Sequence, residues 1–409
     1  MLHSKLVVDS ALAGYATAST DTGHTSATPQ PTRDGSFALR ADGGLNDQVI
    51  EDFASRSLIE TTKTAKSLIQ AFYGQAAEYS YWNGCSTGGR QGLMLAQRYP
   101  DEYDGILAGA PAINWDRFIP AELWPQVVMQ QEFGGPIAEC KLTTATEAAV
   151  AHCDSDDGVA DGVIDDPRRC SFDVMSLVGQ VTPCGEFTTA DAQVVKAIWA
   201  GPRTSGGEEL WFGLSPGAPV DSLAGTAPFP IAEHHQRYWV EQNPQWDWRT
   251  LDYAGFEQNF RDSQKLFHDV IGTDDPNLSP FRQSNGRLLL WHGWNDELIF
   301  PKGTIDYYER VVDAVSDSGP VSEFARLFMA PGVEHCDQGP GPDTFDMFGE
   351  LVRWVEDGAA PDRVTAAKLN DGDGQVVRTR PLCPYPEAAV FDGTGDPNSE
   401  ASFACKRPS

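Results

Sequence analysis

The amino-acid sequence predicts an α/β fold in which a mostly parallel sheet is built from strands that alternate with helices. Three observations lead to this prediction. A stretch of strand composition, a glycine-rich turn and a helical pattern follow one another over residues 79–98. Short apolar runs of strand character recur at residues 104–111, 287–292 and 325–330. A helical pattern at residues 303–316 separates the last two, and such alternation is typical of a parallel α/β sheet.

The N-terminal region contributes further elements to this prediction. Residues 6–14 are predicted to form a short helix, and residues 15–21 a strand that ends in a polar loop. Apolar side chains recur at helical spacing over residues 56–73, and Gly74 follows where a helix would stop. This pattern favours one amphipathic helix. The strand before the glycine-rich turn is placed at residues 79–83.

The alternation of strands and helices breaks off after residue 113. The following stretch is rich in Trp, Pro, Gly and Asp and has no regular strand pattern. A chain of 409 residues also exceeds the roughly 250–300 residues at which a single core stops growing. We therefore expect an N-terminal part of the core over residues 1–113, an inserted lid domain over residues 114–283, and a C-terminal part of the core over residues 284–409.

The composition limits the possible partners of the chain. There are 59 acidic and 30 basic residues, a formal net charge of −29. Such a charge repels polyanions, so we expect no nucleic-acid partner. Hydrophobic residues make up 41% of the chain, enough for a substantial core. No apolar run approaches the ~20 residues that span a bilayer, so no membrane partner is expected.

The eight cysteines indicate the compartment. An even number of cysteines at this density suggests disulfides and an oxidising environment. The first residues show no charged segment followed by an apolar core of ~7–15 residues, so no signal peptide is visible. We therefore expect a secreted protein whose recorded chain lacks its true start.

The segment Gly84-Cys85-Ser86-Thr87-Gly88 matches the pattern GxSxG. Glycines in this pattern let a strand turn so sharply into a helix that the serine stands out at the carboxyl edge of a sheet. Alone, the pattern also fits an ordinary strand-to-helix turn. The predicted strand before it and helix after it favour catalysis. We therefore predict that Ser86 is the nucleophile of an α/β-hydrolase.

A serine nucleophile needs a histidine to remove its proton and an acid to orient that histidine. His335 lies just past the predicted strand that ends at Ala330, and Asp296 follows the strand that ends near Trp291. The chain order Ser86, Asp296, His335 is the order of the α/β-hydrolase fold. These positions predict that His335 is the base and Asp296 the acid.

Other residues compete for these roles. His292 is either a core histidine or an alternative base, and Glu297 is an alternative acid. His234 and His235 lie in the predicted lid, where packing or solvent exposure is expected. A zinc hydrolase is a rival class, but the sequence has no HExxH motif or comparable ligand spacing.

Two cysteines flank the predicted catalytic residues. Cys85 directly precedes Ser86, and Cys336 directly follows His335. A disulfide between them would join the two loops beside the active centre. Eight cysteines allow 105 connectivities, so the sequence alone leaves the pairing open.

An acidic segment runs from Cys153 to Asp166, with Cys170 just beyond it. Clustered carboxylates with intervening glycines suit Ca²⁺, which binds six to eight oxygens. The segment is not an EF-hand, because Val159 stands where the sixth loop position requires glycine. A solvated acidic loop is the alternative, whereas the flanking cysteines favour an ordered loop that holds a cation.

These motifs together resemble the tannase and feruloyl esterase family of secreted α/β-hydrolases. The resemblance covers nearly the whole chain from about Gly14. The segments that carry it are residues 18–24, 83–92, 105–111, 153–166, 293–301, 335–342 and 380–386.

The resemblance implies specific roles for individual residues. Ser86, Asp296 and His335 would form the catalytic triad, and the backbone N–H of Thr87 would donate to the oxyanion. The implied disulfides are Cys85–Cys336, Cys153–Cys170 and Cys383–Cys405, which leaves Cys140 and Cys184 as the fourth pair. The implied ligands of a structural Ca²⁺ in the lid are the side chains of Asp154, Asp157 and Asp161 and the carbonyls of Val159 and Val163.

The resemblance also implies a reaction: hydrolysis of an aromatic ester, hydroxycinnamoyl or galloyl, through a Ser-His-Asp acyl-enzyme mechanism. A plant cell-wall phenolic ester is the expected small-molecule partner. Family members carry earlier strands and a glycine-rich loop that supplies a second oxyanion donor, and we expect both to precede the recorded chain. Losing one donor costs ~3–4 kcal/mol of transition-state stabilisation. The alternative is therefore a catalytically impaired, calcium-stabilised homologue that binds phenolics.

Overall fold

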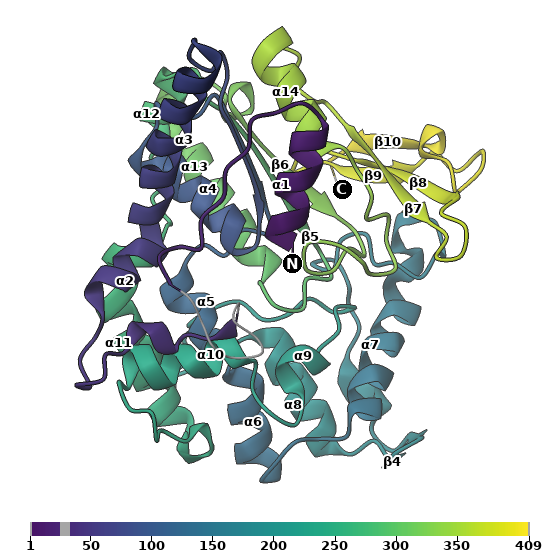
Figure 1. The fold of residues 1–409 in the computed structure, drawn as a ribbon. Coiled ribbons are helices and arrows are strands. Elements are labelled where there is room, and N and C mark those ends of the chain that lie inside the picture. Colours follow the sequence, from purple (N-terminus) through teal and green to yellow (C-terminus); the bar gives the residue numbers. More distant parts are fainter. Residues whose placement is uncertain (1, 25–32, 408–409) are drawn as a thin grey trace.

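The computed structural model describes residues 2–24 and 33–407 (Figure 1). Its centre is a four-stranded sheet in the order β1-β2-β5-β6, and all three neighbouring pairs are parallel. The strands are β1 (Tyr81–Cys85), β2 (Gly105–Gly109), β5 (Arg287–Gly293) and β6 (Ala325–Ala330). The predicted α/β fold with a parallel sheet is confirmed, although β1 begins two residues later than expected.

The two faces of the sheet pack against different helices. Leu288 and Leu290 of β5 face a core shared with helices α4 and α13, whereas Leu289 and Trp291 face a core shared with α14. This alternation is the two-residue period of a strand that is buried on both sides. The helices around the sheet are α3 (Ser57–Tyr73), α4 (Thr87–Arg98), α12 (Ser279–Gln283), α13 (Pro301–Val315) and α14 (Met347–Asp357).

The region between β2 and β5 is mainly helical and forms most of a second core, to which residues 38–54 and 299–300 also contribute. That core is rich in aromatic rings, among them Trp124, Trp211, Trp239 and Phe256. Figure 1 shows these helices gathered below the sheet. They are α5 (Trp115–Ala121), α6 (Trp124–Phe133), α7 (Glu139–Cys153), α8 (Thr189–Ala200), α9 (Asp221–Ala224), α10 (Pro230–His234) and α11 (Tyr253–Ile271), with a small hairpin of β3 (Val181–Thr182) and β4 (Gly185–Glu186).

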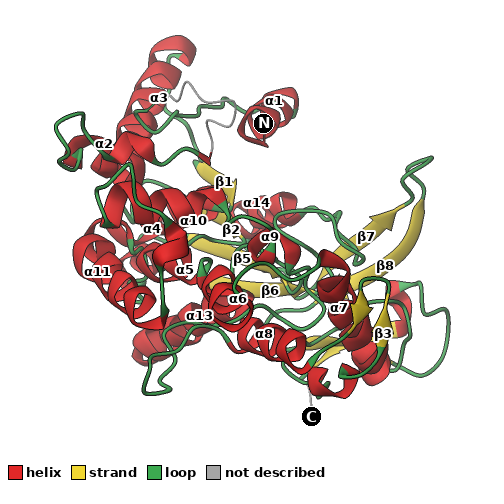
Figure 2. Cartoon of the chain, turned by 90° about the horizontal axis from the view of Figure 1, so that it is seen from below, coloured by secondary structure: helices red, strands yellow, loops and turns green. Residues whose placement is uncertain are grey.

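The C-terminal region adds two antiparallel pairs outside the central sheet. Strands β7 (Val364–Leu369) and β8 (Val376–Leu382) form a hairpin that projects from the body (Figure 2), and β9 (Ala388–Phe391) pairs with β10 (Phe403–Lys406). None of the helices in the described parts of the chain is long and apolar enough to cross a bilayer.

The N-terminal region departs from the prediction at one element. Helix α1 (Leu2–Leu12) and helix α2 (Asp47–Glu51) precede α3, but residues 15–21 form no strand. The Tyr15 ring instead packs edge-on against Tyr81 and Phe348. The predicted strand is therefore wrong, because this segment contacts the body of the molecule through a side chain and not through a backbone ladder.

Candidate active site

The proposed nucleophile lies on a sharp turn between β1 and α4. Ser86 has φ 64° and ψ −126°, a conformation that non-glycine residues rarely adopt. Its backbone N–H donates to the carbonyl of Gly109 at the end of β2 (3.0 Å), and its own carbonyl accepts from Arg90 and Ala112. The turn is thus fixed by hydrogen bonds to the neighbouring strand and to the loop that follows it.

The two glycines of the turn have different steric roles. A Cβ on Gly84 would lie 2.6 Å from the carbonyl carbon of Gly88, closer than real Cβ atoms come. A Cβ on Gly88 would meet nothing within 4 Å. Of the two glycines, only Gly84 must lack a side chain, because its backbone lies directly against that of Gly88. The sequence-based expectation that the turn needs both glycines therefore holds sterically for Gly84 alone.

Helix α4 is anchored behind the nucleophile by an arginine that the sequence reasoning did not single out. Arg90 is fully buried and donates to the carbonyls of Ala54 (2.9 Å) and Phe53 (3.0 Å). Its guanidinium lies over the rings of Phe53 and Trp115. Burial lowers the pKa of Arg90 to about 9. This residue connects helix α4 to the segment before α3 and to helix α5.

The loops after β5 and β6 are joined by backbone hydrogen bonds. The N–H of Trp294 donates to the carbonyl of Ala330 (2.9 Å), and that of Asn295 to the carbonyl of Val333 (3.0 Å). The Asn295 side chain also donates to the carbonyl of Gly217, in the region between β2 and β5 (3.1 Å). These contacts fix the positions from which Asp296 and His335 extend.

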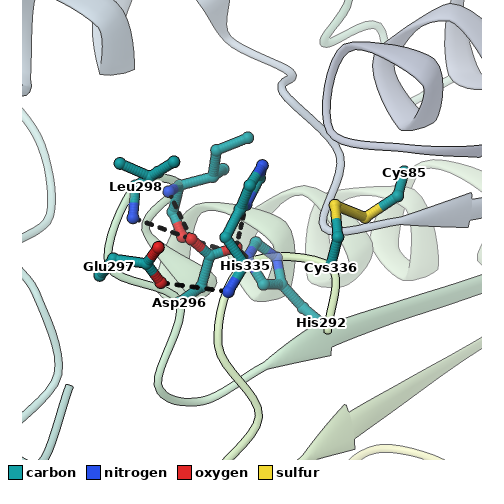
Figure 3. Close-up of a disulfide and its surroundings, with 8 residues drawn as sticks. Cys85, His292, Asp296, Glu297, Leu298, His335 and Cys336 are labelled. Atoms are coloured by element: carbon teal, nitrogen blue, oxygen red, sulfur yellow. Dashed lines mark hydrogen bonds and ion pairs between the residues drawn. A yellow bond between two sulfur atoms is a disulfide. The ribbon is translucent and has the colours of Figure 1, made fainter. Parts of the chain in front are cut away.

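The Asp296 carboxylate is fully buried and accepts hydrogen bonds at both oxygens (Figure 3). Oδ1 accepts from the backbone N–H groups of Leu298 (2.9 Å) and Ile299 (2.7 Å). Oδ2 lies 2.8 Å from Nδ1 of His335 and 3.0 Å from Nε2 of His292. The acid is therefore held rigidly and faces the proposed base.

Electrostatics favour an ionised acid and a basic histidine. Burial alone would raise the pKa of Asp296, but the charge of His335 and hydrogen bonds from His292 and His335 outweigh burial and lower it. Burial alone would lower the pKa of His335, but the charge of Asp296 and their hydrogen bond, followed by Glu297 and Asp337, raise it above its ordinary value. The pair can thus hold a proton taken from a nucleophile.

A disulfide brings the nucleophile's strand to the loop of the base. Cys85 and Cys336 are bonded, with their Cα atoms 6.0 Å apart (Figure 3). Ser86 directly follows Cys85 and His335 directly precedes Cys336, so each is one Cα step of ~3.8 Å from its cysteine. Their side chains, both of which the structure describes, are not hydrogen-bonded to each other. Such contacts often tighten only when substrate binds.

The other three disulfides in the described chain include no cysteine next to Ser86 or His335. They join Cys153–Cys170 and Cys383–Cys405, which the resemblance implied, and Cys140–Cys184, the pair that was left by elimination. No cysteine in the described parts of the chain is free.

The competing residues occupy other positions. Glu297 accepts from the backbone N–H of His335 (3.1 Å) and not from its ring. His234 and His235 lie in the helical region between β2 and β5, where the His235 ring is buried and contacts Ser263 (2.9 Å). His292 is fully buried at the end of β5. The geometry therefore pairs Asp296 with His335.

A second buried carboxyl near the triad was missed by the sequence reasoning. Glu122 is 1% exposed, and its Oε2 atom has no hydrogen-bond partner among the described residues. Burial, and then the charge of Asp296, raise the pKa of Glu122 well above its ordinary value. No pattern in the sequence around Glu122 indicated that its side chain points inward.

The acidic segment is ordered by its own hydrogen bonds. Oδ1 of Asp154 accepts from the backbone N–H groups of residues 161, 162 and 163 (2.9, 2.9 and 3.2 Å), and Asp157 accepts from Val159 (2.9 Å). The Asp161 carboxylate is paired with Arg380 (2.6 Å) and Arg378 (3.3 Å). Within residues 2–24 and 33–407, no three His, Cys, Asp or Glu side chains converge as metal ligands.

The chemistry of this segment nevertheless fits a hard cation. Its available donors are carboxylate and carbonyl oxygens, the ligands that Ca²⁺ takes. Burial raises the pKa of Asp157 to about 6 and that of Asp165 to about 8. A bound cation would stabilise these carboxylates in their charged form.

Comparison with known proteins decides the family. The family model described as "Tannase and feruloyl esterase" matches residues 3–406. The chain belongs to the tannase and feruloyl esterase family. It is 40% identical over 417 residues to a probable feruloyl esterase of Arthroderma benhamiae, across 98% of this chain and 77% of that protein. It is 33% identical to the mono(2-hydroxyethyl) terephthalate hydrolase of Piscinibacter sakaiensis, across 96% and 74%.

Solved structures of this family have the same fold. Feruloyl esterase B from Aspergillus oryzae superposes with a TM-score of 0.80 at 30% identity, across 88% of this chain and 76% of that one. The tannin acyl hydrolase of Aspergillus niger gives 0.82 at 24% identity, across 91% and 73%, which shows a shared fold alone. The resemblance seen in the motifs is thereby confirmed, and this family member is a carboxylic ester hydrolase.

Proposed function

We propose that the enzyme hydrolyses its ester through an acyl-enzyme on Ser86, with His335 as general base and Asp296 as the acid that orients it. The contact that carries this proposal is the 2.8 Å hydrogen bond between Nδ1 of His335 and Oδ2 of Asp296. Because Asp296 is ionised, Nδ1 carries the hydrogen and donates it. The Nε2 lone pair is then free to accept a proton from the Ser86 hydroxyl.

The reaction proceeds in two steps. His335 Nε2 takes the Ser86 proton as Oγ attacks the ester carbonyl, and the same proton then passes to the leaving alcohol as the carbon–oxygen bond breaks. Water attacks the acyl-enzyme next, with its proton again taken by Nε2 and returned to Oγ as the acid departs. The Thr87 N–H stabilises the oxyanion in both steps, because the first N–H of a helix has no acceptor within the helix.

Covalent labelling tests the activation of Ser86. A fluorophosphonate reacts with a serine that a neighbouring base has activated, so peptide mass spectrometry is expected to find the adduct on Ser86. A His335→Ala variant is expected to lose the label. An unlabelled Ser86 in folded protein would contradict the proposal and favour a phenolic-binding homologue, an alternative that the esterase relatives do not favour.

The proposed substrate is an ester with an aromatic acyl group, hydroxycinnamoyl or galloyl, from the plant cell wall. Support comes from relatives named as feruloyl esterases and from the aromatic-rich core of the lid, which lies against the catalytic loops through the contact between Asn295 and Gly217. Rates measured side by side on methyl ferulate, methyl gallate and mono(2-hydroxyethyl) terephthalate would distinguish these acyl groups. Comparable rates on an aliphatic ester would contradict the proposal.

The proposed cofactor is one structural Ca²⁺ in the acidic segment. The side chains of Asp154, Asp157 and Asp161 and the carbonyls of Val159 and Val163 would hold it. The oxygen donors and the burial of Asp157 support this site, although the Asp161 carboxylate would have to be shared with Arg380. The ion would neutralise the segment and take no part in the chemistry.

Secretion is the proposed localisation. Four disulfides in the described chain suit an oxidising compartment and would be reduced in a typical cytosol. Recovery of the active protein from the culture medium of its natural source would support this proposal, and retention inside the cell would contradict it.

A further inference from the structure

His292 is the other histidine that contacts the triad acid. It is fully buried near the end of β5, on the face of the sheet that Leu288 and Leu290 share with helix α13. Its Nε2 lies 3.0 Å from Oδ2 of Asp296 and 3.1 Å from the carbonyl oxygen of Ile299. Its Nδ1 lies 2.8 Å from the hydroxyl of Thr304, which is also buried. Every polar atom of the ring thus has a partner.

These partners determine the tautomer of His292. Nε2 faces a carboxylate oxygen and a carbonyl oxygen, both of which only accept, so Nε2 carries a hydrogen. Nδ1 faces a hydroxyl, which can donate to it. A neutral ring protonated at Nε2 therefore satisfies all three contacts and places no second positive charge beside His335. A ring of this kind has no free lone pair, so His292 is not an alternative base.

Two imidazoles consequently share one oxygen of the acid. Oδ2 of Asp296 is the atom that receives hydrogen bonds from both His292 and His335 (Figure 3). Each hydrogen bond to a carboxylate oxygen withdraws part of its negative charge. The less charge remains on Oδ2, the less strongly it stabilises the imidazolium that forms on His335 during catalysis.

We propose that His292 is a positioning residue which, held by Thr304, fixes Oδ2 of Asp296 toward His335 and limits how strongly that oxygen stabilises the His335 imidazolium. The inference rests on the proposed catalytic roles of Ser86, His335 and Asp296. His292 contacts neither the ester nor the nucleophile. Its effect reaches the reaction only through the carboxylate.

Other charged groups act on the same pair and must be held constant in a test. Glu297 and Asp337 face His335, while Glu122 and Glu334 add negative charge around Asp296. A change at His292 that leaves these four groups in place separates the effect of the His292 ring from that of the surrounding charges. Variants of His292 that differ in a donor at the Nε2 position, but not greatly in volume, meet this requirement.

The test compares His292→Leu with His292→Gln, whose amide nitrogen can stand where Nε2 stands. In His292→Leu the hydrogen bond to Oδ2 of Asp296 is lost. We expect kcat to fall roughly 10-fold to 100-fold, the loss that is typical when the hydrogen-bond partner of a metal-binding side chain is removed. The acidic limb of the kcat/KM profile is expected to move to higher pH by about 0.5–1 unit, because Oδ2 then attracts the His335 proton more strongly. KM is expected to stay within about twofold, because His292 does not touch the substrate.

Recovery of activity in His292→Gln would distinguish a positioning role of His292 from a packing role. His292→Gln is expected to return the acidic limb to its parent position and to regain most of kcat. Thr304→Val, which removes the hydroxyl at Nδ1, is expected to move the limb in the same direction as His292→Leu but less far, while Thr304→Ser is expected to behave as the parent. Melting temperatures measured in parallel identify any variant that fails to fold.

The outcomes also separate this inference from the proposed function. If Ser86→Ala is inactive while His292→Leu keeps the parent's acidic limb, the role of His292 is refuted and the triad stands. An equal loss of kcat in His292→Leu and His292→Gln, with no movement of the limb, likewise refutes it and indicates packing alone. If Ser86→Ala retains full activity, the proposed function itself fails.

Discussion

Nδ1 of His335 lies 2.8 Å from Oδ2 of Asp296, although 39 residues separate the two in the chain. The contact exists because the loops after two adjacent parallel strands, β5 and β6, leave the same edge of the sheet. The disulfide between Cys85 and Cys336 joins the end of β1, directly before Ser86, to the loop that carries His335. Three distant segments thereby meet at one edge of the sheet.

Removal of the charge on the acid tests its pairing with His335. Asp296→Asn is expected to lower kcat by about 10⁴-fold, because an amide favours the wrong tautomer of the base. Glu297→Gln is the matched control, since Glu297 contacts only the backbone N–H of His335, and it is expected to keep kcat within about 10-fold. A greater loss from Glu297→Gln than from Asp296→Asn would assign the acid to Glu297.

The pH dependence of catalysis follows from the raised pKa of His335. The charge of Asp296 overcomes burial and keeps this pKa above the ordinary 6.5. His335 must be neutral to accept the Ser86 proton, so kcat/KM is expected to fall as the pH drops through this raised pKa, and the acidic limb should lie above pH 6.5. A titration of kcat/KM between acidic and mildly alkaline pH measures the limb. An acidic limb of kcat/KM well below pH 6.5 would be inconsistent with an ion pair between Asp296 and His335.

The disulfide beside the site is expected to matter for catalysis more than for stability. Loss of Cys85–Cys336 in a double alanine variant should reduce kcat, because it frees the loop of His335 from the strand before Ser86. The double alanine variant at Cys383 and Cys405 removes a disulfide that does not include a cysteine next to Ser86 or His335 and serves as control. It is expected to lower the melting temperature, consistent with a typical loss of ~2–5 kcal/mol, and to retain kcat. Equal kcat in both variants would refute the catalytic role.

The two glycines around Ser86 are expected to respond differently to an added methyl group. Gly84→Ala places Cβ 2.6 Å from the backbone of Gly88 and should displace Ser86, with a large loss of kcat. Gly88→Ala places Cβ in open space and should keep kcat within a few-fold. Circular dichroism establishes that both variants fold. A Gly88→Ala variant as inactive as Gly84→Ala would show that sterics at the turn do not explain the motif.

Calcium removal tests the acidic segment. Chelation is expected to lower the melting temperature, and added Ca²⁺ to restore it, because the ion binds the folded state alone. The kcat of the remaining folded enzyme should change little. Asp154→Asn is expected to remove most of the calcium effect. A melting curve that chelation leaves unchanged would eliminate the proposed site.

The sheet and the positions of the proposed triad residues could be predicted from the sequence for a physical reason. Strands such as β6, buried on both faces, appear as short apolar runs, and the predicted bounds at residues 325–330 are those of β6. Once the strands are located, the rule that parallel strands present their following loops at one edge indicates Asp296 and His335 as partners. The sharp turn at Ser86 could also be predicted, because it requires a glycine at position 84, which is visible in the sequence.

Other features depend on contacts that leave no local pattern. Residues 15–21 have strand composition but no strand partner, so local propensity gave the wrong prediction there. His292 follows an apolar run like any core residue, and only the fold reveals that its ring meets Asp296 and Thr304. Glu122 lies in an apolar stretch, and only the packing of the helices between β2 and β5 determines that its side chain is buried. The arginine partners of Asp161 come from β8, more than 200 residues away.

The most direct test of the account is ester hydrolysis by Ser86→Ala measured beside the parent enzyme under identical conditions. The substitution removes one oxygen from a half-buried side chain and leaves the Cys85–Cys336 disulfide and the Asp296–His335 pair intact. The account predicts that kcat falls by about 10⁶-fold, as when a serine nucleophile is removed from a triad, with an unchanged melting temperature. Equal rates in the variant and the parent would contradict it.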